Sequence, residues 1–292
     1  MLPQSPEDGG GTWPEIRGLA WLAEAEGADS LWVSDHFLYR AGDGTTVGVH
    51  EPWSLVAAVA ASTRRVQIGT LVMATIFRPP GVLAKMAATT DDVAGGRLIL
   101  GLGCGWHEPE YQAFGYPFDH RVGRFEEALE VIVRLLREGS VTYAGSWYTL
   151  DDAIVLPAPA HRTPILVAAR RPRMMRITAR LADAWQTAWY GLPDEKFAAE
   201  LAEFRAACDA EGRDPTTVEM MVGLTVGGSD PETRHIALDP AALADGLAEW
   251  AAIGVGHVQL AVEPTSEASF NTALEGIRRF RNGGSGGAAS AS

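Results

Sequence analysis

The chain has 292 residues, of which 47% are hydrophobic and 21% charged, and its formal net charge is -13. An acidic chain repels nucleic-acid phosphates, and no apolar run approaches the roughly 20 residues that span a bilayer, so we expect neither nucleic-acid binding nor a membrane span. Cys104 and Cys208 form no CxxC pair, which argues against a disulfide framework or a zinc site and fits the cytoplasm. The N-terminus shows no secretory signal.

The first half of the chain alternates predicted helices and strands. Thr12 to Glu15 combines a capping residue, a proline in the first turn and a capping-box glutamate, and Gly27 ends the predicted helix. The apolar run 30–33 follows as a strand buried on both faces. Further along, we expect a long loop at 40–51, helices at 52–62 and 82–93, and strands at 65–75 and 97–103.

The second half continues this alternation after a loop at 104–123, an amphipathic helix at 125–136 and a hairpin at 141–159. Strands are predicted at 165–169, 184–189, 217–226 and 257–262, and helices at 174–181, 195–211, 240–253 and 270–280. Repeats of about 30 residues indicate βαβ units with right-handed crossovers.

Seven strands and a fragment at Leu2-Pro3 indicate an α/β fold, a (β/α)8 TIM barrel with a truncated first strand and an insertion between the fourth and fifth strands. One domain is expected over residues 1–282. Residues 283–292 contain only Gly, Ser and Ala, which predicts a flexible tail.

Asp35 and His36 directly follow the first buried strand. Barrel active sites lie at the C-terminal ends of the strands, so this pair is the first candidate site. His36 can exchange a proton near neutral pH, and Asp35 can orient it or accept a hydrogen bond. The alternative is a helix-capping aspartate beside a histidine that the backbone satisfies.

Two further segments lie at predicted strand ends. At residues 71–75 a bulge would lie against a planar ligand, although the residues alone favour a plain core strand. The alternating glycines of 101–105 permit close approach of a ligand, but their spacing is not a dinucleotide fingerprint. Trp106 would wall a pocket or pack under its loop. His107-Glu108 does not form HExxH, so zinc hydrolysis and a metal site are not indicated.

Arginines concentrate at 162, 170, 171, 173, 176 and 180 of this acidic chain. Residues 169–172 lie between a predicted strand and a helix, where backbone N–H and guanidinium groups converge in a way that binds phosphate. The alternative is a solvated basic helix face, which suits Arg176 and Arg180, one turn apart.

No Ser-His-Asp arrangement and no P-loop can be identified, so the chemistry is expected from a cofactor. On the segments 2–4, 29–37, 70–78, 96–111, 114–115, 121–136 and 164–185, the chain resembles the luciferase-like monooxygenase superfamily. It looks most like the branch that uses the deazaflavin coenzyme F-420 (8-hydroxy-5-deazaflavin).

The resemblance implies a barrel with the deazaflavin ring at its C-terminal mouth. Asp35 and His36 match a Ser-Asp-His-Phe motif that faces the ring, where the histidine helps proton transfer. Leu71-Val72 matches a non-prolyl cis peptide that bulges against the back of the ring. The catalytic groups implied are His36, Asp35 and Trp106. The implied cofactor contacts are Asp35, His36, Leu71, Val72, Met73, Ala74, Gly103, Trp106, Ala168, Ala169, Arg170 and Arg171.

The chain departs from the family pattern at three places. The phosphate loop usually carries glycines, whereas residues 168–171 are Ala-Ala-Arg-Arg, whose arginines would suit an anionic tail. Trp106 stands where some deazaflavin dehydrogenases carry a catalytic glutamate, which weakens a sugar-phosphate dehydrogenase interpretation. The first strand is almost missing, and an unfilled gap would expose strand edges and lower stability.

The resulting expectation is an enzyme that transfers a hydride between F-420 and a small organic substrate. Family relatives are commonly dimers, so a homodimer is expected. The alternatives are an FMN-dependent monooxygenase of the same superfamily and a non-catalytic flavin-binding protein.

Overall fold

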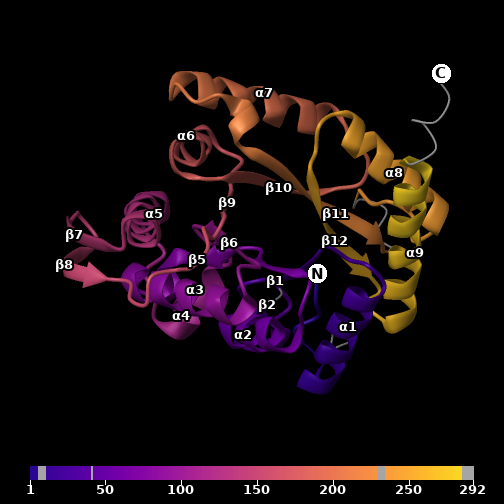
Figure 1. The fold of residues 1–292 in the computed structure, drawn as a ribbon, viewed down its shortest axis with the longest axis horizontal. Helices are drawn as coiled ribbons and strands as arrows, with labels where there is room; N and C mark the ends of the chain where they lie inside the picture. The colour runs from indigo at the N-terminus through magenta and orange to yellow at the C-terminus, as the bar shows by residue number, and fades with distance from the viewer. Residues whose placement is uncertain (6–10, 41, 229–233, 285–292) are drawn as a thin grey trace.

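The structure is a computed structural model that describes residues 1–5, 11–40, 42–228 and 234–284. Its main strands are β1 (Ser30–Val33), β4 (Gln67–Thr70), β5 (Met73–Ala74), β6 (Leu98–Gly103), β9 (Ile165–Ala168), β10 (Ala184–Tyr190), β11 (Glu219–Gly227) and β12 (His257–Glu263). They form one parallel sheet in the order β1–β4–β6–β9–β10–β11–β12, with β5 also paired to β6 (Figure 1). The predicted barrel of parallel strands is confirmed.

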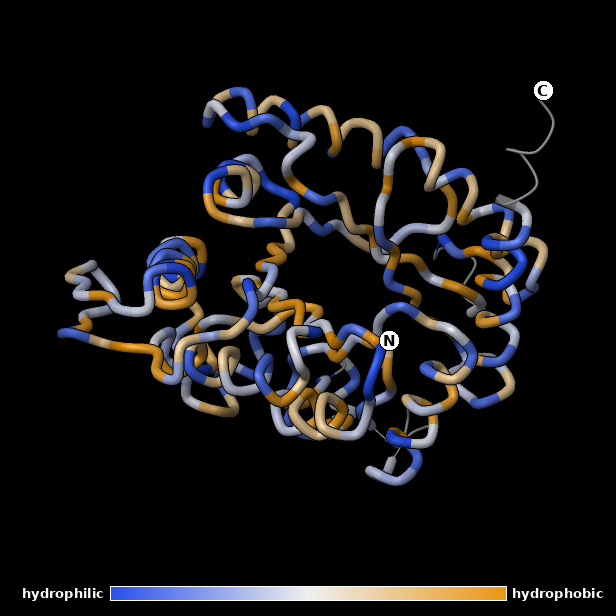
Figure 2. Tube along the Cα trace, viewed as in Figure 1, coloured by the Kyte–Doolittle hydropathy of each residue, from blue (hydrophilic) through white to orange (hydrophobic). Residues whose placement is uncertain are grey.

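Helices surround this sheet (Figure 1). They are α1 (Trp13–Ala25), α2 (Pro52–Ser62), α3 (Pro80–Ala94), α4 (Glu108–Phe114), α5 (Arg121–Glu138), α6 (Pro172–Leu181), α7 (Glu195–Ala210), α8 (Pro240–Ala252) and α9 (Glu267–Gly284). Figure 2 shows largely hydrophobic residues along the central strands and mixed residues along the helices. Most of these helices bury an apolar face in the core, whereas α4 buries Glu110 and Tyr111 and contacts β2. Among the described helices, none is both long and apolar enough to cross a membrane.

The barrel interior is filled by side chains rather than left as a pore. Trp32 lies across β4, where a Cβ on Gly69 would stand 2.1 Å from the indole ring. A glycine at position 69 is therefore what allows the tryptophan to fill the interior. Its partners in this inner cluster are Ile99, Leu166, Ala184 and Met221.

Two predicted loops contain regular structure instead. In the expected loop 40–51, β3 (Thr46–Gly48) pairs antiparallel with β2 (Leu38–Arg40), because Gly44 supplies the positive φ of 90° that the turn requires. The expected loop 104–123 contains α4, whose first turn holds Pro109 and two acidic residues. These are helix-start signals, and a loop prediction there was wrong.

The insertion lies where it is predicted, between β6 and β9. It is an antiparallel hairpin of β7 (Ser140–Ala144) and β8 (Thr149–Ile154). At the other end of the chain, α9 extends to Gly284, so the first two residues of the expected tail are helical. The rest of that tail, residues 285–292, lies outside the described part of the chain.

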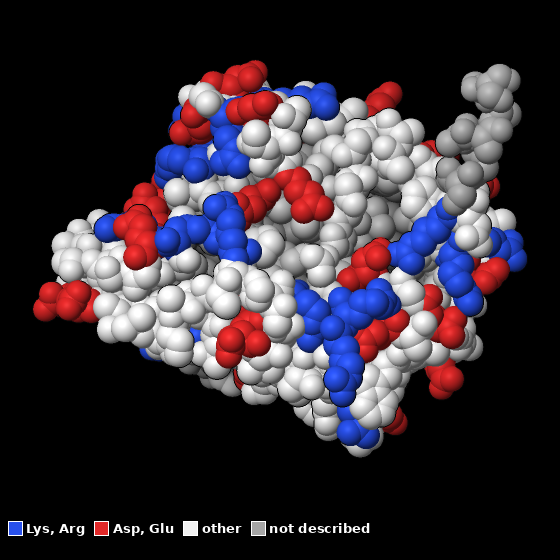
Figure 3. All heavy atoms as spheres, viewed as in Figure 1, with Lys and Arg blue, Asp and Glu red and all other residues white. Residues whose placement is uncertain are grey.

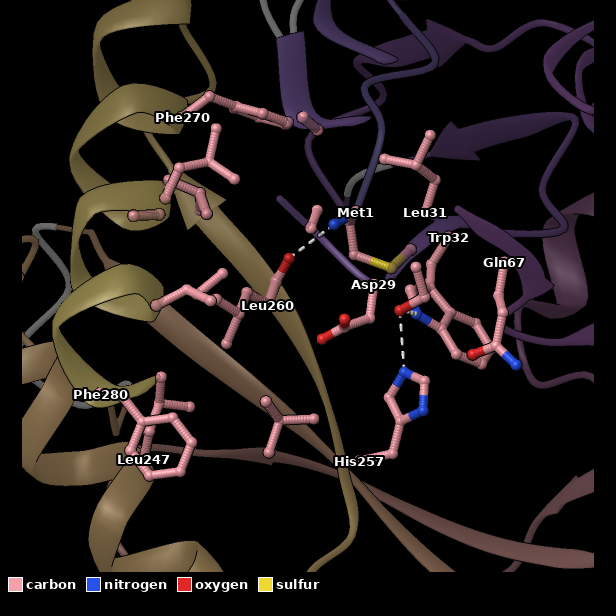
Figure 4. Close-up of a pocket in the computed structure, with 18 of the residues that line it drawn as sticks. Met1, Asp29, Leu31, Trp32, Gln67, Leu247, His257, Leu260, Phe270 and Phe280 are labelled. Atoms are coloured by element: carbon pink, nitrogen blue, oxygen red, sulfur yellow. Dashed lines mark hydrogen bonds between the residues drawn. The ribbon is translucent and has the colours of Figure 1, made fainter. Parts of the chain in front are cut away.

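The N-terminal residues lie between β12 and β1, the two ends of the sheet order. The Met1 amine donates to the Leu260 carbonyl at 2.6 Å, and the Leu2 N–H donates to the Trp32 carbonyl at 2.9 Å. A cavity of about 360 Å³ adjoins them, between the two strands and helix α9 (Figure 4). Residues 1–5 form no strand, and β1 and β12 are not paired with each other in the described sheet.

Candidate active site

Five strands, β1, β5, β6, β9 and β10, end at one cavity of about 430 Å³. The C-terminal ends of parallel strands meet at one face of a barrel, so side chains far apart in sequence gather there. The predicted site residues that line this cavity are Asp35, His36, Leu71, Val72, Ala74, Gly103, Trp106, Ala168, Ala169, Arg170 and Arg171. Met73 is the exception, because its neighbours face the cavity and its own side chain points into the core, fully buried.

His36 is held by a buried glutamate that sequence reasoning missed. Its Nδ1 lies 2.8 Å from Oε2 of Glu110, a residue of α4 with an exposed fraction of 1%. The other carboxylate oxygen accepts the N–H groups of Phe37 and Leu38 at 2.5 and 3.2 Å. Burial raises the pKa of Glu110, but the His36 contact and these N–H groups outweigh it and hold the pKa below 4.5.

Because Nδ1 is bonded to Glu110, Nε2 is the ring nitrogen left for exchange with a ligand. The indole ring of Trp106 stands edge-on to the imidazole, with ring centroids 5.6 Å apart. Trp106 is 64% exposed, so it walls the cavity from its open side rather than packing under the loop.

Asp35 is an anchor beside this cavity. It is 4% exposed, and both of its oxygens accept from the Arg78 guanidinium at 3.0 to 3.1 Å. One oxygen also accepts the Ala74 N–H at 2.8 Å. The carboxylate therefore ties the end of β1 to the segment that follows β4, which fixes the wall of the cavity.

Gln4 fixes the residue just before Asp35. Its amide donates to the Ser34 carbonyl at 2.9 Å, and its carbonyl oxygen accepts the Ser34 N–H at 2.8 Å. The same oxygen accepts the Ser34 hydroxyl at 2.5 Å. The N-terminal segment 1–5 thus fixes the backbone position of the residue before Asp35.

The expected bulge is present between β4 and β5. The peptide bond between Leu71 and Val72 is cis, as the resemblance implies. A Cβ on Gly103 would stand 2.7 Å from Cγ2 of Val72. Glycine at the end of β6 is therefore what makes room for the bulge on the cavity floor.

The arginines divide into two groups. Arg170 and Arg171 line the cavity just before α6. The others pair with carboxylates elsewhere: Arg173 and Arg180 with Glu126, Arg176 with Glu211 and Arg162 with Asp183. The solvated helix face thus accounts for Arg173, Arg176 and Arg180 on α6, whereas Arg162 lies before β9.

The loop before α6 offers guanidinium groups more than backbone donors. The Ala169 N–H already donates to the Gln186 carbonyl at 3.1 Å, so it is not free for a phosphate. Arg170 Nε lies 3.3 Å from the Thr187 hydroxyl and 4.0 Å from a Glu200 oxygen, and its side chain is 44% exposed. An anionic group at this end would therefore be held chiefly by side chains.

The described residues contain no cluster of three or more His, Cys, Asp or Glu arranged to hold a metal ion. The cavity combines one imidazole–carboxylate pair, the apolar side chains of Leu71 and Val72, and two arginines. This set suits a planar ring with an anionic tail.

The profile of the luciferase-like monooxygenase family matches residues 2–265. The chain belongs to this family. Among curated relatives, it is 38% identical over 169 residues to an F420-dependent glucose-6-phosphate dehydrogenase of Amycolatopsis mediterranei, covering 56% of this chain and 50% of the relative. It is 34% identical over 170 residues to the pyrimidine monooxygenase RutA of Escherichia coli, covering 56% and 47%. The chain thus spans about half the length of these curated relatives.

Solved structures of under 25% identity to this chain share its fold over most of their length. An F420-dependent secondary alcohol dehydrogenase in complex with an F420-acetone adduct superposes with a TM-score of 0.76 at 19% identity, covering 90% of this chain and 93% of that chain. The monooxygenase RslO1 of Streptomyces bottropensis gives 0.73 at 23% identity, covering 93% of each. An F420-dependent dehydrogenase and a monooxygenase therefore both have this fold.

Proposed function

We propose that this protein is an F-420-dependent oxidoreductase that transfers a hydride between the deazaflavin and a small organic substrate. The observation that carries the proposal is one cavity that combines the His36–Glu110 pair, the 71–72 bulge and two arginines. The relatives named for F-420 support it. A cytoplasmic homodimer belongs to the same proposal, and light scattering tests the dimer.

The residues present fit this cofactor. Leu71 and Val72 would support the back of the ring, while Gly103 leaves room beside them. Arg170 and Arg171 would hold the anionic tail at the α6 end. When bound, F-420 supplies the redox chemistry, which no side chain in the cavity provides.

The protein supplies orientation and a proton relay. Oxidation of an alcohol removes a hydride from carbon and a proton from oxygen, so a base is needed beside the oxygen. His36 Nε2 is the group we assign to that proton, since Nδ1 is fixed by Glu110. Asp35, bonded to Arg78 and Ala74, acts as a positioning group, and Trp106 limits the access of water.

The second candidate is an FMN-dependent monooxygenase. The relationship to RutA favours it, and the two arginines would also hold a single phosphate. A non-catalytic flavin-binding protein is the third, and it would bind a cofactor without turnover.

A comparative titration separates these candidates. The protein is titrated with F-420 and with FMN, followed by tryptophan fluorescence, and the F-420 complex is then mixed with a panel of alcohols. Saturable F-420 binding, together with an alcohol-dependent loss of the absorbance of oxidised F-420, supports the proposal. Tight FMN binding without F-420 binding overturns it in favour of the monooxygenase. Binding without bleaching on any alcohol, or on any ketone with the reduced cofactor, indicates the non-catalytic protein.

A further inference from the structure

A second and larger cavity, of about 1180 Å³, opens at the same mouth of the barrel. It adjoins the first because Trp189 lines both cavities. Ser34 lines the second and precedes the Asp35-His36 pair that lines the first. Tyr39 also lines it, and its ring centroid lies 4.5 Å from that of His36. The proton-carrying histidine therefore stands at the border of the two spaces.

The two cavities differ in charge. The first ends at Arg170 and Arg171, whereas the described lining of the second contains no lysine or arginine. Among the described lining residues, Glu263 at the end of β12 is the only Asp or Glu, and His235 is the only histidine.

The Glu263 carboxylate has room to contact a ligand in this cavity. A Cβ on Gly228 would stand 2.9 Å from its Oε2, so the glycine leaves space beside the carboxylate. Glu263 is exposed, and no hydrogen bond or ion pair of its side chain is present within the described part of the chain. Figure 3 shows charged side chains of both signs around a hollow on the face it presents.

Two basic groups, one in the lining and one next to it in sequence, do not offset the charge of this carboxylate. Arg234 pairs with Asp194 instead. The Met1 amine donates to the Leu260 carbonyl, and burial lowers its pKa to about 5, so it is neutral at pH 7. The Glu263 carboxylate is therefore expected to repel an anionic ligand in this cavity and to attract a cationic one.

We infer that the second cavity is the substrate chamber and that Glu263 makes it select neutral or cationic organic substrates against phosphorylated or carboxylated ones. The inference rests on the proposed function, because it places the substrate across His36 from the cofactor cavity. The anionic end of the cofactor then lies at the arginines and the substrate lies at the opposite, acidic end. The sugar phosphate named for the relatives does not suit this chamber.

The experiment uses four probes: a neutral aromatic alcohol, its ammonium and carboxylate analogues of matched size, and glucose 6-phosphate. Saturation-transfer NMR measures their binding with and without F-420, and turnover is measured with F-420. The variants are Glu263→Gln and Glu263→Lys, with Glu267→Gln on α9, outside this chamber, as a matched control. Affinity for F-420 is measured for every variant.

We expect the two anionic probes to bind about tenfold more weakly than the neutral probe in the wild-type protein. Glu263→Gln should reduce this discrimination, and Glu263→Lys should reverse it by about tenfold or more, with F-420 affinity unchanged. A wild-type preference for the anionic probes, or the same discrimination in all variants, overturns the inference. If the proposed function is wrong, the wild-type protein will not bind F-420. The NMR measurement without the cofactor tests the charge preference of the second cavity in either case.

Discussion

His36 Nδ1 lies 2.8 Å from Glu110 Oε2, and 74 residues of sequence separate them. The same carboxylate binds the backbone N–H groups of the two residues after His36. One buried side chain on α4 therefore fixes both the ring and the loop that carries it. Its lowered pKa keeps it ionised across the neutral range, so the imidazole is always held from the same side.

Loss of either partner should reduce turnover without loss of cofactor binding. His36→Asn removes the proton acceptor, so we expect kcat to fall about 100-fold or more, and Glu110→Gln should cost about tenfold or more through misorientation of the ring. Stopped-flow bleaching of F-420 measures both. Glu108→Gln, an exposed residue of the same helix, is the matched control. Full turnover of His36→Asn would remove the imidazole from the mechanism.

The buried Asp35–Arg78 pair should matter for stability. Asp35→Asn removes the buried carboxylate partner of the Arg78 guanidinium and leaves it only the partly exposed Glu51 at 2.6 Å. Breaking a buried pair costs about 3 kcal/mol or more. Urea unfolding measures the free energy of unfolding. Asp119→Asn, which removes the exposed partner of Arg124, should change it little. Equal effects of the two substitutions would contradict the anchoring role of Asp35.

The two cavity arginines should set cofactor affinity. Arg170→Gln combined with Arg171→Gln should weaken F-420 binding by about tenfold or more, and the loss should shrink at high salt because the contacts are charge-based. Arg176→Gln lies on the exposed side of α6 and should leave the affinity unchanged. Equilibrium titration by fluorescence checks both. An unaltered affinity of the double variant would place the anionic tail elsewhere.

The gap beside Met1 predicts a pH dependence of stability. Burial lowers the pKa of the Met1 amine from 8.0 to about 5, so the unfolded chain binds more protons between these values. Stability is therefore fully present above pH 8 and declines as the pH falls toward 5. Urea unfolding across this range measures the slope, and a flat profile would contradict the buried neutral amine.

Filling the gap should stabilise the protein. An extension of roughly five apolar residues before Met1 would place a peptide N–H at the Leu260 carbonyl and apolar side chains in the cavity of about 360 Å³. We expect a higher Tm and a weaker pH slope than in the original chain. A Gly-Ser extension of equal length is the control, and no gain over it would argue against a strand-shaped gap.

The helices, the strands and the residues at the strand ends could be predicted from the sequence, because capping residues and apolar runs are local patterns. The capping box Thr12–Glu15 begins α1 as predicted, and the apolar run 30–33 is β1. Asp35 and His36 then fall at the barrel mouth by topology alone. The Leu71–Val72 bulge came from the family resemblance, since its residues by themselves favour a plain strand.

The partners of the site residues were not accessible, because they depend on contacts across the fold. Nothing in the sequence near Asp35 indicates Arg78, and a predicted loop at 104–123 gives no reason to place Glu110 beside His36. The pairing of Arg173 and Arg180 with Glu126 on α5, and of Arg176 with Glu211 just after α7, likewise follows from helix packing. Only the folded chain shows which arginines remain at the cavity.

A crystal structure of the protein soaked with F-420 tests the central claim most directly. The account predicts the deazaflavin ring resting on Leu71 and Val72, with His36 at its edge and the anionic tail at Arg170 and Arg171. Electron density for the ring outside this cavity, or a tail directed away from α6, would contradict it.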